Sequence, residues 1–140
     1  MGAAGLTLTG ILKRNLHVMP QRFENLVQTI PIYIDTTLTG LGLSAAAYKI
    51  LHIEADTLVV GGYLVTDVAE GAAETITIGD VAAANTFLTT TSLNTNDTAT
   101  AFTTLMKYFA AADEIQITPS AAQGTSKFWV IVQLLKLNKS

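Results

Sequence analysis

An alternation of aliphatic and polar residues with a period of two governs the sequence from Ile32 onward. The run Thr75-Ile76-Thr77-Ile78 shows it most clearly, and residues 115–118 repeat it just before Pro119. Successive side chains of a β-strand point to opposite faces of its sheet, so this period predicts half-buried strands. The segments that carry the alternation, or a β-rich run of similar length, are 32–35, 48–53, 58–66, 75–78, 115–118 and 128–137.

Short strands at nearly regular spacing are typical of two antiparallel sheets packed face to face. We therefore predict an all-β fold, a single jelly-roll-like β-sandwich of about seven or eight strands. Residues 128–137 are apolar on both faces, which favours a central place in a sheet. Gly61-Gly62 predicts a bulge or a close backbone approach. Two segments fit either a helix or a strand, 45–51 and 103–112.

The first 31 residues follow a different pattern and are predicted to form an extended N-terminal arm ahead of a sandwich domain spanning 32–140. Residues 6–9 alternate like a short strand, and residues 22–30 fit one or two helical turns. Pro20 and Pro31 exclude one continuous helix. The arm residues expected to contact other proteins are Leu6, Leu8, Ile11, Leu12, Lys13, Arg14, Arg22 and Phe23.

Charge is scarce and unevenly distributed. The arm holds three basic residues and one acid, which gives 3 − 1 = +2, and the remaining residues hold five basic and ten acidic side chains, which gives 5 − 10 = −5. An acidic body disfavours nucleic acid as its partner. Only 14% of the chain is charged while 49% is hydrophobic, so we expect much of its surface to be covered by copies of itself or by a larger assembly.

No pattern in the chain indicates a membrane, metal, cofactor or catalytic function. Its longest apolar run, between Trp129 and Leu135, is too short to cross a bilayer, and the chain has no cysteine. The G-x-G-x-x-A match at 40–45 lacks the helix and second strand of a dinucleotide site, so an inter-strand loop is the better interpretation. We predict neither enzyme activity nor a cofactor.

The histidines and acidic residues are not spaced as in a catalytic site or a calcium-binding loop. His17 and His52 have no apparent acid or nucleophile partner, and His52 is expected at a strand edge or an interface. One acidic stretch raises the question of a calcium site, but an incidental acidic turn is favoured because the spacing matches no calcium loop. The acids concerned are Asp67, Glu70, Glu74 and Asp80.

Aromatic residues offer a second interpretation, a carbohydrate- or receptor-binding platform on a fibre or tail. The candidates are Trp129, Phe128, Tyr108 and Phe109. Two of them, Phe128 and Trp129, lie in the most apolar segment, where a role in the core or in an interface is favoured.

Several motifs resemble those of small β-sandwich virion proteins of tailed bacteriophages, over roughly residues 45–137. They are Ala55-Asp56-Thr57-Leu58-Val59-Val60-Gly61-Gly62, Thr75-Ile76-Thr77-Ile78-Gly79-Asp80, Phe87-Leu88, Ala111-Ala112-Asp113-Glu114-Ile115-Gln116-Ile117-Thr118 and Lys127-Phe128-Trp129-Val130-Ile131-Val132. The resemblance implies a structural protein of the virion, with capsid decoration, capsid cementing and fibre-like roles all found in such proteins and the capsid role favoured here. It also implies an oligomer, expected to be a homotrimer, with the major capsid protein as partner and the arm docking onto neighbouring subunits.

Overall fold

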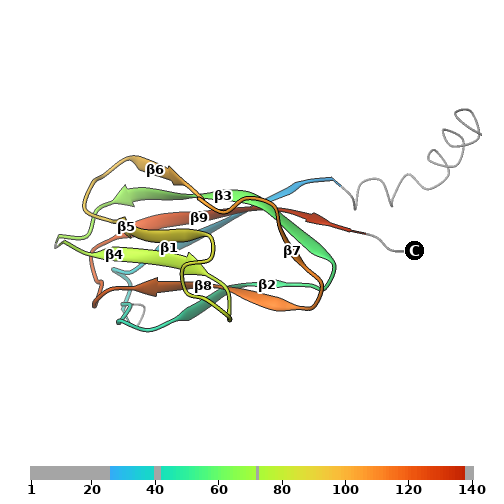
Figure 1. Cartoon of the computed structure of the whole chain (residues 1–140). Helices are drawn as coiled ribbons and strands as arrows, with labels where there is room; N and C mark the ends of the chain where they lie inside the picture. The colour runs from blue at the N-terminus through green and yellow to red at the C-terminus, as the bar shows by residue number, and fades with distance from the viewer. Residues whose placement is uncertain (1–25, 40–41, 72, 138–140) are drawn as a thin grey trace, which may run out of the picture.

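The computed structural model describes residues 26–39, 42–71 and 73–137, which form two antiparallel sheets stacked as a sandwich (Figure 1). Nine strands are present in these ranges, so the all-β prediction is confirmed with slightly more strands than expected. Their bounds are β1 Gln28–Asp35, β2 Tyr48–Ile53, β3 Thr57–Val68, β4 Thr75–Gly79, β5 Leu88–Ser92, β6 Thr98–Ala101, β7 Lys107–Phe109, β8 Asp113–Pro119 and β9 Lys127–Lys136.

The strands pair as in one long antiparallel hairpin, with its turn between β4 and β5, that is bent over to form both sheets. One sheet runs β1-β9-β3-β6, with the short β7 also paired to β3, and the other runs β2-β8-β4-β5. The pairs β4–β5, β3–β6, β2–β8 and β1–β9 are therefore nested, because the chain retraces its own path in reverse after β5. This nesting gives the predicted jelly-roll-like topology.

The hydrophobic core lies between the sheets and follows directly from the alternation. In β9 every second residue from Phe128 to Leu134 is buried, and the residues between them face outward. The opposite sheet contributes the alternate isoleucines of β4 and β8. Burying each such side chain contributes about 1.5–3 kcal/mol. β9 pairs with both β1 and β3, which confirms its predicted central position.

The two adjacent glycines of β3 serve opposite faces of the sheet. The register of β3 against β9 shifts between Val59 and Gly61, so the predicted bulge is present. The ring of Phe102 packs where a Gly62 side chain would lie, and the side chain of Leu105 lies over Gly61. The segment between β6 and β7 therefore passes from the core side of β3 to its outer side.

The first strand begins before the predicted boundary at Ile32. Residues 28–31 are paired with β9, so they belong to the sheet and are neither arm nor helix. Pro31 is compatible with this place because β1 is an edge strand, which needs hydrogen bonds on one side only. The arm residues with predicted contacts lie outside the described residues, namely Leu6, Leu8, Ile11, Leu12, Lys13, Arg14, Arg22 and Phe23.

The two ambiguous segments also adopt extended structure. Residues 48–53 form β2, and residues 107–109 form the short β7 at the edge of β3. The 40–45 motif lies in the connection between β1 and β2. The described parts of that connection, residues 36–39 and 42–47, contain no helix, and Leu43 makes an isolated bridge to Gln123.

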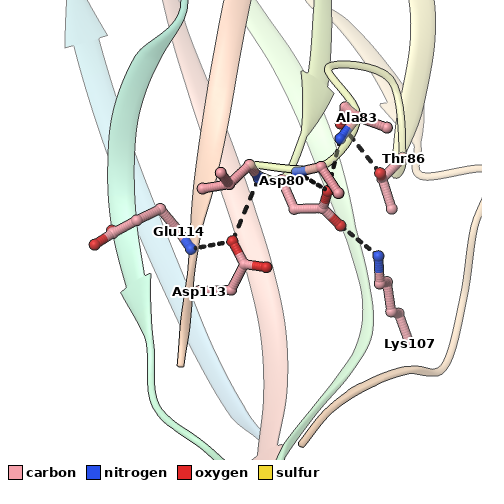
Figure 2. A network of polar contacts seen from close by, with 8 residues as sticks. Asp80, Ala83, Thr86, Lys107, Asp113 and Glu114 are labelled. Atoms are coloured by element: carbon pink, nitrogen blue, oxygen red, sulfur yellow. Dashed lines mark hydrogen bonds and ion pairs between the residues drawn. The ribbon is translucent and has the colours of Figure 1, made fainter. Parts of the chain in front are cut away.

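A buried ion pair joins the two sheets at the end of β4 (Figure 2). Asp80 is almost completely buried and accepts hydrogen bonds from the backbone N–H groups of Ala82 and Ala83 and from the ammonium of Lys107 on β7. Asp113 accepts from the backbone N–H groups of Val81 and Glu114. These contacts hold the loop after β4 against both sheets.

Candidate docking face

The outer surface of the β1-β9-β3-β6 sheet is apolar across its middle, and we call it the outer apolar face. It consists of the residues of these strands that alternate with the core residues. They are Thr29, Pro31, Tyr33, Leu58, Tyr63, Val65, Ala99, Ala101, Trp129, Ile131, Gln133 and Leu135.

Strand register arranges the largest of these side chains in rows across the sheet. Trp129 of β9 lies directly between Tyr33 of β1 and Val65 of β3. The rings of Tyr33 and Trp129 are 4.7 Å apart between centroids and inclined at 44°, which is a favourable aromatic contact. In the next row Ile131 lies beside Tyr63. The face is therefore a continuous aromatic and aliphatic surface built from three strands.

The connection between β6 and β7 extends this surface at the edge of β3. Leu105 and Met106 are the most exposed large apolar residues beside the sheet, at 59% and 62% of their full exposure. Met106 has a φ of 62°, a left-handed conformation uncommon outside glycine and asparagine. Exposed apolar side chains and an unusual backbone conformation are concentrated in this short segment.

Among the described residues, charged side chains flank the outer apolar face and are absent from its middle. At one end Asp35 and Lys127 pair at 3.9 Å between Oδ2 and Nζ. Beyond the other end Lys136 lies opposite Thr57, on the inner side of the sheet, and 3.6 Å from the carboxylate of Glu54. The twelve residues of the face itself are all uncharged, so a partner would have few ions to desolvate on binding.

The outer surface of the second sheet has the opposite character. His52 of β2 and Glu114 of β8 face each other with 3.0 Å between Nδ1 and Oε1, and the exposed Lys49 is paired with Gln116. Thr77 of β4 lies on the same side of the sheet. Polar and charged side chains of this kind are easily solvated. Since large apolar patches on folded proteins mark interaction sites, the outer apolar face is the stronger candidate for docking.

Two of the four predicted aromatic candidates contribute to this face. Trp129 is part of it, and Tyr108 lies half-exposed at its edge with its hydroxyl donating to Asp56 at 2.6 Å. Phe128 and Phe109 are buried in the core. Tyr33 and Tyr63 were missed as candidates, although their alternation with core residues was a signal that they point outward.

Three of the four candidate acids of the calcium hypothesis are engaged in separate contacts, and the fourth, Asp67, is exposed on β3. Glu70 accepts hydrogen bonds from the backbone N–H groups of residues 124–126, Glu74 accepts from the hydroxyl of Ser120, and Asp80 pairs with Lys107. Within the ranges that the structure covers, no cluster of three or more His, Cys, Asp or Glu residues could hold a metal ion. The same ranges include no helix of the length and apolarity that a membrane span requires.

No protein-family model and no curated protein matches the chain. Three solved structures share its fold. A chain of the cyanophage Pam1 capsid asymmetric unit is 18% identical with a TM-score of 0.61, and the match covers 79% of this protein and 85% of that chain. A chain of the Ralstonia phage GP4 capsid is 12% identical with a TM-score of 0.59, over 81% and 86% of the two chains.

The third structure is the acid-stable capsid of the Helicobacter pylori bacteriophage KHP30. One of its chains is 12% identical with a TM-score of 0.56, and the match covers 79% of this protein and 93% of that chain. At such low identity the likeness establishes a common fold. The likeness extends over most of both chains in all three comparisons.

Proposed function

We propose that the protein is a structural component of a tailed-bacteriophage virion that decorates or stabilises the capsid. The observation that carries this proposal is the shared fold with chains from three phage capsids, each matched over at least 85% of its length. A fold can host unrelated functions, so the surface must also suit the role. A shell protein needs wide contact surfaces and no catalytic centre.

The outer apolar face supplies such a contact surface. Tyr33 and Tyr63 are 44% and 42% exposed, and they border the half-buried Trp129 and Ile131. Aromatic residues are enriched at protein interfaces and charged residues are depleted from their centres. Covering this face with a neighbouring subunit would remove apolar area from water at about 25 cal/mol per Å², part of which is offset by the entropy of association.

The protein acts as an oligomer, for which we propose a homotrimer, and the major capsid protein is its partner in the shell. The arm grips neighbouring subunits, and its net charge of +2 is opposite to the −5 of the remaining residues. Contacts that are weak individually become strong when they are repeated around a shell, because each further contact is made at high effective concentration.

Deletion of residues 1–25 tests the docking role of the arm without touching β1. We expect the truncated protein to fold as the full chain does, because the sandwich strands begin at Gln28. Its binding to capsids that lack this protein should weaken at least tenfold, about 1.4 kcal/mol, in a co-sedimentation assay. A folded truncation that binds as well as the full chain would remove the arm from the mechanism.

Imaging of phage particles tests the proposal as a whole. Particles made with and without the protein should differ by a sandwich-sized density repeated on the capsid surface. If that density appears only on the fibre or tail, the capsid assignment is wrong.

A binding module for carbohydrate or a receptor is the second candidate, favoured by the Tyr33–Trp129 pair on the outer apolar face. Sugar rings stack on exposed aromatic rings of this kind. A glycan array separates the two functions, because a module of this type should bind a defined glycan and lose it in the Trp129→Ala variant. A structural shell protein should bind none.

A further inference from the structure

A cavity of about 510 Å³ opens between the two sheets where β1 begins and where β2 and β9 end. Its apolar wall is formed by Ile30, Ile53 and Leu134, one from each of these strands. β1 and β2 are edge strands of their respective sheets, and no other strand of the described residues covers this side of the sandwich. The cavity therefore reaches the rim of the core, where Ile53 and Leu134 are buried beneath it.

The polar groups around the cavity are already paired with one another. Lys136 lies 3.6 Å from the Glu54 carboxylate and donates a hydrogen bond to the carbonyl of Ala55. His52 contacts Glu114. An ionic ligand would have to break these pairs in order to bind, whereas aliphatic side chains could pack against the apolar wall and leave the pairs intact. An apolar cavity of roughly 150 Å³ holds a benzene-sized group, so this one has room for more than one leucine side chain.

The described residues before β1 do not line the cavity. Gln28 lies at its rim, but the two residues before it, Leu26 and Val27, are 55% and 51% exposed and do not contribute to the lining. Within the described part of the chain, this side of the sandwich is therefore left open.

We propose that this cavity receives the N-terminal arm of a neighbouring copy of the same chain, with Leu6 and Leu8 inserted between the sheets. The arm's Leu-Thr-Leu-Thr run presents an apolar side chain at every second position, which is the pattern of a strand with one face toward a core. Extended segments commonly bind by addition to an exposed sheet edge, and β1 and β2 both offer one. This inference rests on the proposed role as an oligomeric shell protein and names where its arm docks.

Charge on the two parts of the chain favours such an exchange. The arm carries +2 and the body −5, so an arm is attracted to another copy's body and two bodies repel one another. The arm's basic residues, among them Lys13 and Arg14, follow the leucines at a short distance. They would lie outside the cavity, where water and the acidic body can stabilise them.

Cross-linking of full-length chains tests the exchange, because the natural sequence contains no cysteine. One chain carries Leu8→Cys and a second, of distinguishable mass, carries Glu54→Cys at the cavity rim. The control replaces the second chain by one with Thr77→Cys, on the polar outer surface of the other sheet. A disulfide between unlike chains requires Cα atoms within about 7 Å. We expect at least a tenfold larger heterodimer fraction with Glu54→Cys than with Thr77→Cys.

Two further variants separate specific insertion from general stickiness. Leu8→Asp should abolish self-association in gel filtration, whereas Thr9→Asp, on the opposite side of the same run, should leave it nearly unchanged. Equal cross-linking of both rim and control chains, or no cross-linking, would overturn the proposal. The proposal would also be overturned if a chain that carries both Leu8→Cys and Glu54→Cys formed the disulfide efficiently within itself and not between chains.

Binding to particles is measured on the same proteins in a separate assay. If chains cross-link as expected but never attach to a capsid, the capsid function fails while the arm site stands. If they attach to capsids without cross-linking, the arm site alone is wrong.

Discussion

Asp80 is the residue on which the loop after β4 depends. Burial alone raises the pKa of its carboxyl, but hydrogen bonds from Lys107, from the Ala83 N–H and from Thr86, together with the Lys107 charge, outweigh burial and hold the pKa below its ordinary value. Because the folded-state pKa lies below that of an unfolded aspartate, the carboxylate stabilises the fold above the unfolded value. That contribution is lost as the pH falls toward the folded value.

Replacing Asp80 by Asn should therefore lower stability and flatten its dependence on pH. The variant keeps an acceptor for the loop N–H groups but leaves Lys107 without its anion. We expect a loss of about 2–3 kcal/mol at neutral pH and a shallower decline below about pH 4, measured by denaturant unfolding at several pH values. Asp67→Asn, an exposed carboxylate on β3, is the control and should change stability by less than about 0.5 kcal/mol. An unchanged pH slope in Asp80→Asn would contradict this account.

At the scale of elements, β3 pairs with β6, β7 and β9, and its two adjacent glycines face opposite sides of the sheet. Gly62 faces the core, where a β-carbon would collide with the Ile131 carbonyl oxygen and the Phe102 ring. Gly61 faces outward, where a β-carbon would meet the flexible end of Leu105 at 3.1 Å. At Gly62 the neighbouring backbone cannot shift easily, whereas at Gly61 the Leu105 side chain can move aside.

The Gly62→Ala variant should therefore be much less stable than Gly61→Ala, although the chemical change is identical. Overpacking a tight core position costs about 1–3 kcal/mol, and we expect Gly62→Ala at the upper end of that range. The free energy of unfolding of Gly61→Ala should stay within about 1 kcal/mol of that of the natural protein, because alanine also reduces the conformational entropy of the unfolded chain. Thermal unfolding of the two variants compares them directly, and equal melting temperatures would refute the assignment of their faces.

Most strands could be predicted from the sequence, and the two that were missed share a composition. β4, β8 and β9 place aliphatic residues at every second position, which reveals their period. β5 and β6 consist mainly of threonine and alanine, which are found on both the buried and the exposed face of a sheet, so these strands show no alternation of large aliphatic and polar residues. Only their pairing with β4 and β3 identifies them as strands.

The docking face could be predicted in its parts but not as a whole. Alternation indicates that Tyr33, Tyr63 and Trp129 point away from the core, yet they lie far apart in the sequence. They become neighbours only through the order β1-β9-β3, which depends on long-range pairing. The arm differs from the rest of the chain in charge and proline placement, but the alternation becomes visible only at Ile32, so the sequence places the boundary four residues after the observed start of β1 at Gln28.

At the scale of the whole molecule, the two outer surfaces are unlike, one apolar and one polar. In its proposed capsid role, a protein with this asymmetry should dock by one surface and present the other to solvent. Tyr63→Lys, at the centre of the outer apolar face, should weaken capsid binding or self-association at least tenfold, because it places a charge in a desolvated contact. Thr77→Lys on the polar surface is the matched control and should have little effect in the same sedimentation assay.

Folding of both variants is checked by thermal unfolding before binding is compared. If Tyr63→Lys binds normally while Thr77→Lys does not, the two surfaces have been assigned the wrong way round.

The pairing of β1 with β9 also has a mechanical consequence. Residues 28 and 134 are partners, so the first and last strands enter and leave the sandwich at the same end (Figure 1). Tension applied between the arm and the C-terminal end of β9 would load the eight paired positions of β1 one after another, as in a zipper, and not all together in shear. In the proposed shell role, a subunit held by its arm would then yield gradually under internal pressure, by peeling one edge strand while the remaining strands stay folded.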